Sequence, residues 1–156
     1  MDLVLGDGDC LGSRLQLIHT PGHDNDCVCW YDRLTRTVIT GDSLQANGTI
    51  CQGVGFYKSL PDYRYTLERL SGMDIDNILC GHDYDGIGYR MTGKEAVREA
   101  LDYCRSRVDA YGTFIRTHAE LDAPEIARRL IDAEGCGTPE RLFMALYTVT
   151  EHLKEI

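Results

Sequence analysis

The stretch "CVCWYDRLTRTVIT", residues 27–40, constrains the fold of this chain more than any other. Two apolar runs rich in aromatic and β-branched residues flank a polar turn, which is the pattern of a β-hairpin. Because side chains alternate along a strand, both sides of this hairpin are apolar: Cys27, Cys29 and Tyr31 on one, Val28 and Trp30 on the other. We therefore expect the hairpin to belong to a sheet that is covered on both faces.

The neighbouring segments predict further strands and one helix. "LVL" at 3–5 and "RLQLIHT" at 14–20 are typical of a second hairpin-like pair. Ser59 offers an N-cap for a helix, and "DNILCG" at 76–81 returns to a short buried strand. Residues 43–58 carry three glycines and no sustained period, which indicates a long irregular loop of the kind that is often functional. The alternation of strand, helix and strand favours an α/β fold.

After about residue 91 the pattern changes to helices only. A capping box over residues 122–125 opens one helix, and Thr138-Pro139 begins the last one. Apolar residues at helical spacing predict the inner face of that last helix: Leu142, Leu146, Val149 and Leu153. We expect an α/β domain over residues 1–90 and a helical C-terminal extension over residues 91–156 that packs on it.

Charge and cysteine content limit the function classes. A net charge of −9 and a pI near 4.9 argue against nucleic acid or an anionic membrane as partner, because both attract a cationic surface. The seven cysteines are an odd number without a CxxC pair, which favours a reducing cytoplasm. No apolar stretch approaches the roughly 20 residues of a membrane span, and no signal peptide opens the chain. We expect a cytoplasmic protein that acts on a small-molecule substrate.

Three potential metal ligands, His23, Asp42 and His82, each come directly after a glycine that ends an apolar strand. Glycine lets the backbone turn sharply, so that the next side chain points into a site. In a layered α/β fold the strand ends meet at one rim, where functional groups collect. Imidazole and carboxylate are the ligands that a hydrolytic transition metal needs. The three positions together predict a metal site.

Each of these residues also has a plainer interpretation. His23 alone is a solvated histidine after a Pro-Gly turn, and Asp42 and His82 are common types of turn residue. The ligand interpretation is favoured because the three coincide in register. His19 is assigned a structural role, and Cys27 and Cys29 are assigned to packing.

The strings "LIHTPGH", "TVITGD" and "LCGHD", in this order, resemble the second half of a metallo-β-lactamase-fold hydrolase, close to the glyoxalase II-like branch. The resemblance covers residues 1 to about 90, and the later helices resemble more loosely those that many members carry at their C-terminus. It implies the C-terminal half of an αββα sandwich, with one mixed sheet and flanking helices, followed by a helical tail.

The resemblance also implies roles for these residues. His23 binds the first of two metals, Asp42 bridges both, and His82 binds the second. The metals are zinc, with iron or manganese as alternatives, and a metal-bound hydroxide attacks a carbonyl, for instance that of a thioester. No side chain then acts as the nucleophile. Tyr57 and Tyr84 are predicted to contact the substrate, and Cys51 lies in the loop near the site.

One family feature is missing, since the chain contains no HxHxDH motif, which supplies the other metal ligands in family members. What remains is one imidazole for each metal and a shared carboxylate, too few for a tight site. The chain is then either a fragment of a longer hydrolase, inactive on its own, or a non-catalytic interaction module. A lone half also exposes the inner face of its sheet, so we expect self-association or a missing N-terminal half that covers it.

Overall fold

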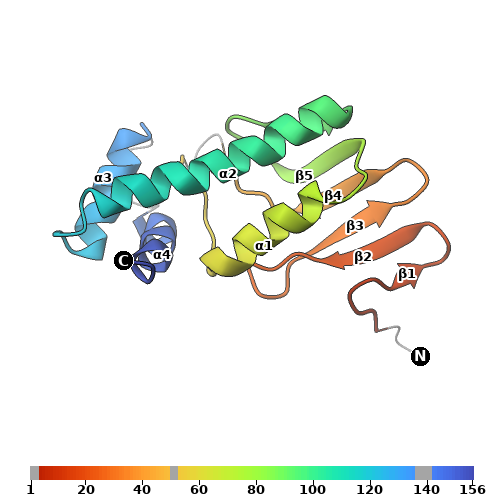
Figure 1. Ribbon diagram of the computed structural model, residues 1–156, viewed down its shortest axis with the longest axis horizontal. Helices are drawn as coiled ribbons and strands as arrows, with labels where there is room; N and C mark the ends of the chain where they lie inside the picture. Colours follow the sequence, from red (N-terminus) through yellow and green to blue (C-terminus); the bar gives the residue numbers. More distant parts are fainter. Residues whose placement is uncertain (1–3, 50–52, 136–141) are drawn as a thin grey trace.

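The computed structural model describes residues 4–49, 53–135 and 142–156, and these form one six-stranded mixed sheet with helices on one face (Figure 1). The strands lie in chain order, and only β4 and β5 run parallel. Their bounds are β1 Cys10–Leu11, β2 Leu15–His19, β3 Val28–Asp32, β4 Thr37–Gly41, β5 Asn77–Tyr84 and β6 Gly88–Thr92. The predicted fold class, a mixed sheet with flanking helices and a helical tail, is confirmed.

The two predicted hairpins have different outcomes. The hairpin over residues 27–40 is confirmed, because β3 and β4 pair antiparallel with Trp30 opposite Ile39. The strand predicted at 3–5 is wrong: Val4 and Leu5 form no strand, and residue 3 lies outside the described residues. The chain joins β2 only from Gly8, whose N–H donates to the Leu17 carbonyl at 2.9 Å. Val4 is 89% exposed, so no layer covers this apolar run.

Four helices accompany the described part of the sheet: α1 Leu60–Ser71, α2 Lys94–Arg116, α3 Ala123–Ala133 and α4 Leu142–Leu153. The predicted caps are present, because the side chains of Ser59 and Asp122 accept hydrogen bonds from the backbone N–H groups three residues on. Figure 1 shows α1 and α2 across one face of the sheet, and α3 and α4 beyond its end. The predicted start of the last helix at Thr138-Pro139 lies outside the described residues.

The core has two parts that share α2. Ile18, Cys29, Val38 and Ile78 point from four strands toward α1 and the first part of α2, and each is at most 4% exposed. The last turns of α2 pack instead with α3 and α4 in a second apolar cluster. The long helix therefore fixes the helical tail against the sheet domain.

The opposite side of the sheet, here called the open face, is not covered by any described residue. A row of apolar side chains crosses it in register, from Leu17 through Trp30 and Ile39 to Leu79. Ile39 is 45% exposed and Val28 is 37% exposed. The expectation that both faces are covered is thus wrong for the described residues. The exposure agrees with that expected for a half sandwich, since sheets with two apolar faces pack on another layer.

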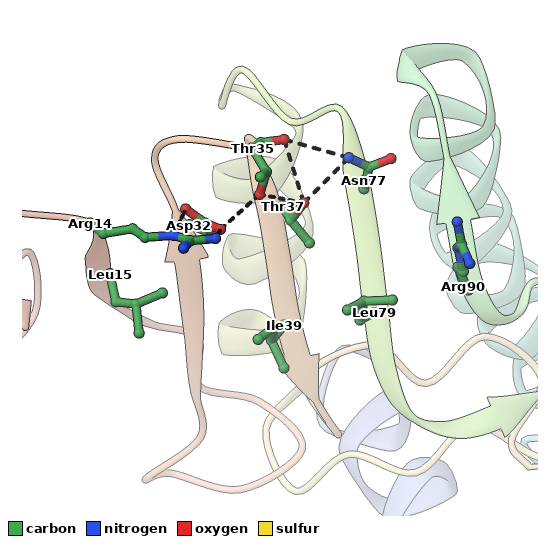
Figure 2. A pocket seen from close by; sticks show the side chains of 9 residues that line it. All are labelled: Arg14, Leu15, Asp32, Thr35, Thr37, Ile39, Asn77, Leu79 and Arg90. Carbon is green, nitrogen blue, oxygen red and sulfur yellow. Dashed lines mark hydrogen bonds and ion pairs between the residues drawn. The ribbon is translucent and has the colours of Figure 1, made fainter.

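A hollow of about 680 Å³ lies on the open face, at the end of the sheet where β4 and β5 begin (Figure 2). Its apolar floor is formed by Leu15, Ile39 and Leu79, and the Arg14–Asp32 ion pair stands at one side. None of the predicted metal ligands lines it, because Asp42 follows the far end of β4.

Two details of the elements differ from prediction. The strand expected to end at Gly81-His82 continues to Tyr84, and it turns back into β6, which the sequence pattern did not indicate. The inner face of α4 includes buried polar residues, Thr148, Glu151 and His152, besides the apolar Val149.

In the part of the chain that the structure describes, no helix is long and apolar enough to span a membrane.

Candidate metal centre

The turn that carries His23 is held against the N-terminus of α1. Gly22 has a φ of +134°, and a Cβ placed on it would lie 2.5 Å from the Cα of Tyr63. The carbonyl of Gly22 accepts hydrogen bonds from the N–H groups of Lys58 and Ser59 at 2.8 and 3.1 Å. Glycine is required here for both its conformation and the close backbone contact, so the Pro-Gly pair places His23 at a defined point.

The imidazole of His23 is oriented by the loop before α1. Its Nδ1 donates to the carbonyl of Phe56 at 2.9 Å, and its ring meets the Phe56 ring edge-on at 5.0 Å between centroids. Because a carbonyl can only accept, the neutral ring carries its proton on Nδ1, and its Nε2 keeps the lone pair that a metal would bind. Histidines that bind metals are commonly held in this way by their second ring nitrogen.

Asp42, directly after the end of β4, lies beside His82, which belongs to the last part of the neighbouring strand β5. The Nε2 of His82 is 3.3 Å from Oδ1 of Asp42, and both side chains remain partly exposed. Gly41 has a φ of +51°, which lets the chain turn out of β4 before Asp42. Gly81 lies inside β5, and a Cβ there would be 2.8 Å from Oδ1 of Asp42. The expected turn at Gly81 is absent: glycine there makes room for the carboxylate.

The buried side chain of Tyr84 forms a hydrogen bond with Asp42. Its hydroxyl donates to the same Oδ1 at 3.1 Å, and the residue is 2% exposed. Burial, and next the charge of Asp42, raise the pKa of the phenol well above its ordinary value, so it stays protonated and can donate. Tyr84 thus contacts a predicted ligand, and its contact with a substrate stays a prediction.

Tyr57, the other predicted substrate contact, lies in the core. It is 1% exposed, its ring stacks on Tyr63 at 4.9 Å, and its hydroxyl forms a 2.6 Å hydrogen bond with Nε2 of His152. A side chain this buried cannot touch a substrate while the core stays intact. Cys51, in the same loop, lies outside the described residues.

Three other residues considered in the sequence, His19, Cys27 and Cys29, lie in surroundings that fit structural roles. Nε2 of His19 donates to the carbonyl of Asn25 at 2.9 Å and so closes the turn that contains His23. Cys29 is fully buried beside Thr20, and burial raises the pKa of its thiol, as it does for Cys27. Raised thiol pKa values disfavour the thiolate that a metal needs.

The role of one residue in this region, Gln45, was not predicted from the sequence. Gln45 is 4% exposed, and its side-chain carboxamide hydrogen-bonds to the backbone of both Asp42 and Phe56, the residue that orients His23. It sits in the loop over residues 43–58, where no periodic pattern distinguishes one polar residue from another. Its place three residues after Asp42 was the available signal.

The donors present fit a metal in kind but fall short in number. Catalytic zinc takes three protein ligands, whereas Asp42 and His82 form a pair. Among the described residues, no group of three or more histidine, cysteine, aspartate or glutamate side chains is arranged to hold a metal ion. His23 is oriented but stands outside such a group. These residues do not make a complete metal centre.

Comparison with known proteins gives a family and a fold. The family model described as "Metallo-beta-lactamase superfamily" matches residues 1–82. Acyl-coenzyme A thioesterase MBLAC2 from Bos taurus is 33% identical over 87 residues, and the Homo sapiens protein of that name is 32% identical over the same length. Each alignment covers 51% of this chain and 30% of the relative.

Two solved structures share the fold. A metallo-beta-lactamase family protein from Thermus thermophilus superposes with a TM-score of 0.64 at 22% identity, over 98% of this chain and 49% of that one. A beta-lactamase domain protein from Burkholderia ambifaria gives 0.75 at 20% identity, over 97% of this chain and 45% of that one. The chain thus spans less than half the length of the solved proteins that it resembles.

Proposed function

Since the chain belongs to the metallo-beta-lactamase superfamily, we propose that it is the C-terminal part of a metal-dependent hydrolase that acts on thioesters. His23, Asp42 and His82 are its share of the ligands for two metal ions, taken to be zinc. The remaining ligands come from an N-terminal half that packs on the open face. The chain is inactive without that half.

The observation that carries this proposal is the arrangement of Asp42, His82 and Gly81. A carboxylate and an imidazole meet at 3.3 Å at the rim of the sheet, where Gly81 leaves room for the carboxylate. The thioester class is supported by the thioesterase relatives, whose alignments cover about half of this chain. A metal bound at this rim would activate water and polarise the substrate carbonyl.

A second candidate function is favoured by the open face. Its apolar row crosses four strands, and exposed apolar surfaces of this kind mark interaction sites. In this alternative the chain is a non-catalytic interaction module that dimerises or binds a partner through that face, and the site residues are vestigial.

Zinc titration followed by calorimetry tests the metal assignment. We expect weak, saturable binding by the purified chain under reducing conditions, because two or three ligands hold zinc less tightly than a full set. His82→Gln should weaken zinc binding at least about tenfold, because loss of a ligand should cost at least as much affinity as loss of a residue that only orients a ligand. The matched control is His118→Gln, whose ring stacks on Phe114 away from the site. Equal zinc binding by both variants would contradict the assignment.

The encoding sequence provides an independent test. Under the hydrolase proposal, the reading frame upstream of residue 1 contains an HxHxDH motif, and the longer protein hydrolyses butyryl-coenzyme A with release of the free thiol. An upstream frame without that motif would favour the interaction module instead.

A further inference from the structure

We propose that Gln45 is a positioning residue that connects two parts of the site by hydrogen bonds. One part, the His23 arm, is His23 with Phe56, and the other, the Asp42–His82 arm, is the carboxylate–imidazole pair with Tyr84. This inference rests on the proposed function, because His23, Asp42 and His82 are its predicted ligands. It assigns a role to a buried residue that does not belong to the predicted ligand set.

The first arm runs from Gln45 to His23. Oε1 of Gln45 accepts a hydrogen bond from the backbone N–H of Phe56 at 3.1 Å. The carbonyl of Phe56 in turn accepts from Nδ1 of His23 at 2.9 Å. Gln45 therefore fixes the backbone of the residue that selects the ring orientation and the tautomer of His23.

The second arm runs from Gln45 to Asp42. Its Nε2 donates to the backbone carbonyl of Asp42 at 2.7 Å and approaches the hydroxyl of Tyr84 at 3.4 Å. That hydroxyl donates to Oδ1 of Asp42, the oxygen nearest to His82. One side chain thus steadies both the main chain and, through Tyr84, the carboxylate of Asp42.

The orientation of the carboxamide follows from its partners. A flipped Gln45 would place its NH₂ group against the N–H of Phe56 and its oxygen against the carbonyl of Asp42, two repulsive contacts. Because the group is buried, each lost hydrogen bond would also leave a polar atom without a partner. The carboxamide is therefore expected to hold both arms in one fixed geometry, and its loss should be felt in both.

Imidazole NMR on the metal-free protein tests the coupling without relying on activity. Long-range ¹H–¹⁵N spectra report which ring nitrogen of each histidine carries the proton. In the wild type, His23 should be the Nδ1–H tautomer. Gln45→Met, which keeps the size but loses both hydrogen bonds, should give a mixture with the Nε2–H form and should also shift the ring resonances of His82.

Two further variants separate the arms. Tyr84→Phe removes only the hydroxyl beside Asp42, so it should shift the resonances of His82 and leave His23 unchanged. The matched control, Tyr57→Phe, removes a buried hydroxyl of the same loop that bonds to His152 and should affect neither ring. A folded Gln45→Met protein with wild-type His23 and His82 spectra would overturn the proposal, as would equal changes in Tyr57→Phe.

If Gln45→Met does not fold, hydrogen exchange on the wild type decides. We expect the amide of Phe56 and the carboxamide protons of Gln45 to exchange slowly, and exchange at the rate of an unstructured peptide would overturn the link. The outcome is separable from that of the proposed function. The predicted tautomers without any zinc binding would overturn the metal assignment alone, whereas zinc binding without them would overturn the coupling alone.

Discussion

Gly22 lies so close to the backbone of α1 that no side chain fits between them. We predict that Gly22→Ala lowers the free energy of unfolding by about 3 kcal/mol or more, through steric overlap with Tyr63 and a φ of +134° that L-residues rarely adopt. Urea unfolding measures the loss. The control is Gly12→Ala, at a positive φ of +66° with open space around it, which should cost only about 1–2 kcal/mol. Equal losses would show that the contact with α1 contributes nothing.

His152 gives the fold a predictable response to acid. Burial, and then the nearby charge of Arg64, lower its pKa to about 4 from an ordinary 6.5. Between these values the unfolded chain binds a proton that the folded chain does not, so stability falls as the pH falls from 6.5 toward 4. The contribution is fully present above pH 6.5 and is on the order of 3 kcal/mol.

Thermal or urea unfolding across this pH range should therefore show a shallower decline for His152→Gln than for the wild type. Carboxylates titrate in both proteins, so the difference between the two curves isolates His152. His118→Gln leaves the buried histidine in place and should follow the wild-type curve. Parallel curves for wild type and His152→Gln would contradict the assigned burial.

Among the elements, α1 is the one whose start is most clearly specified by the sequence. The Oγ of Ser59 accepts from the N–H of Asp62, and Ser59→Ala should lower the free energy of unfolding by about 1 kcal/mol. The matched control is Ser106→Ala on α2, where alanine is the better helix former and no N–H loses a partner. Chemical denaturation of both variants checks the prediction, which fails if the two changes are equal.

The elements that could be predicted are those with local signals. The hairpin of β3 and β4 and the caps of α1 and α3 each follow from turn or capping chemistry within a few residues. Strand β6 was missed because "GYRMT" carries Tyr89 and Arg90 at exposed positions and pairs only along one edge. It follows β5 directly after the turn at residues 85–87 and pairs with it antiparallel, so what the sequence lacked was a recognisable strand pattern and not a nearby partner.

The candidate site shows the same division. The glycines before Asp42 and His82 led to two side chains that the structure brings together, whereas His23 stands apart from them, and the role of all three as ligands stays a prediction. The roles of Tyr84, Tyr57 and Gln45 depend on partners between 3 and 95 residues away, and no spacing in the sequence encodes these pairings. Likewise, Glu151 of α4 turns inward because its carboxylate accepts from the N–H of Leu60.

At the scale of the whole molecule, the open face is the side of the sheet that no described residue covers. Its row of apolar side chains, continued by the hollow shown in Figure 2, lies opposite the helices. Whether an N-terminal half or another partner covers this face in the working protein, the isolated chain exposes it to water. The hydrophobic effect should then drive association between copies as concentration rises.

We therefore predict that sedimentation velocity detects concentration-dependent association of the isolated chain, and that Ile39→Lys reduces it at least about tenfold in affinity, since burying an unpaired ammonium group is costly. Ile39 is 45% exposed, so the variant should still fold. Leu34→Lys makes the same change of charge at a 76% exposed turn residue away from the row and should associate like the wild type. Equal association of the two variants would place the contact elsewhere, and a wild type that stays monomeric at all concentrations would mean that the open face tolerates water unaided.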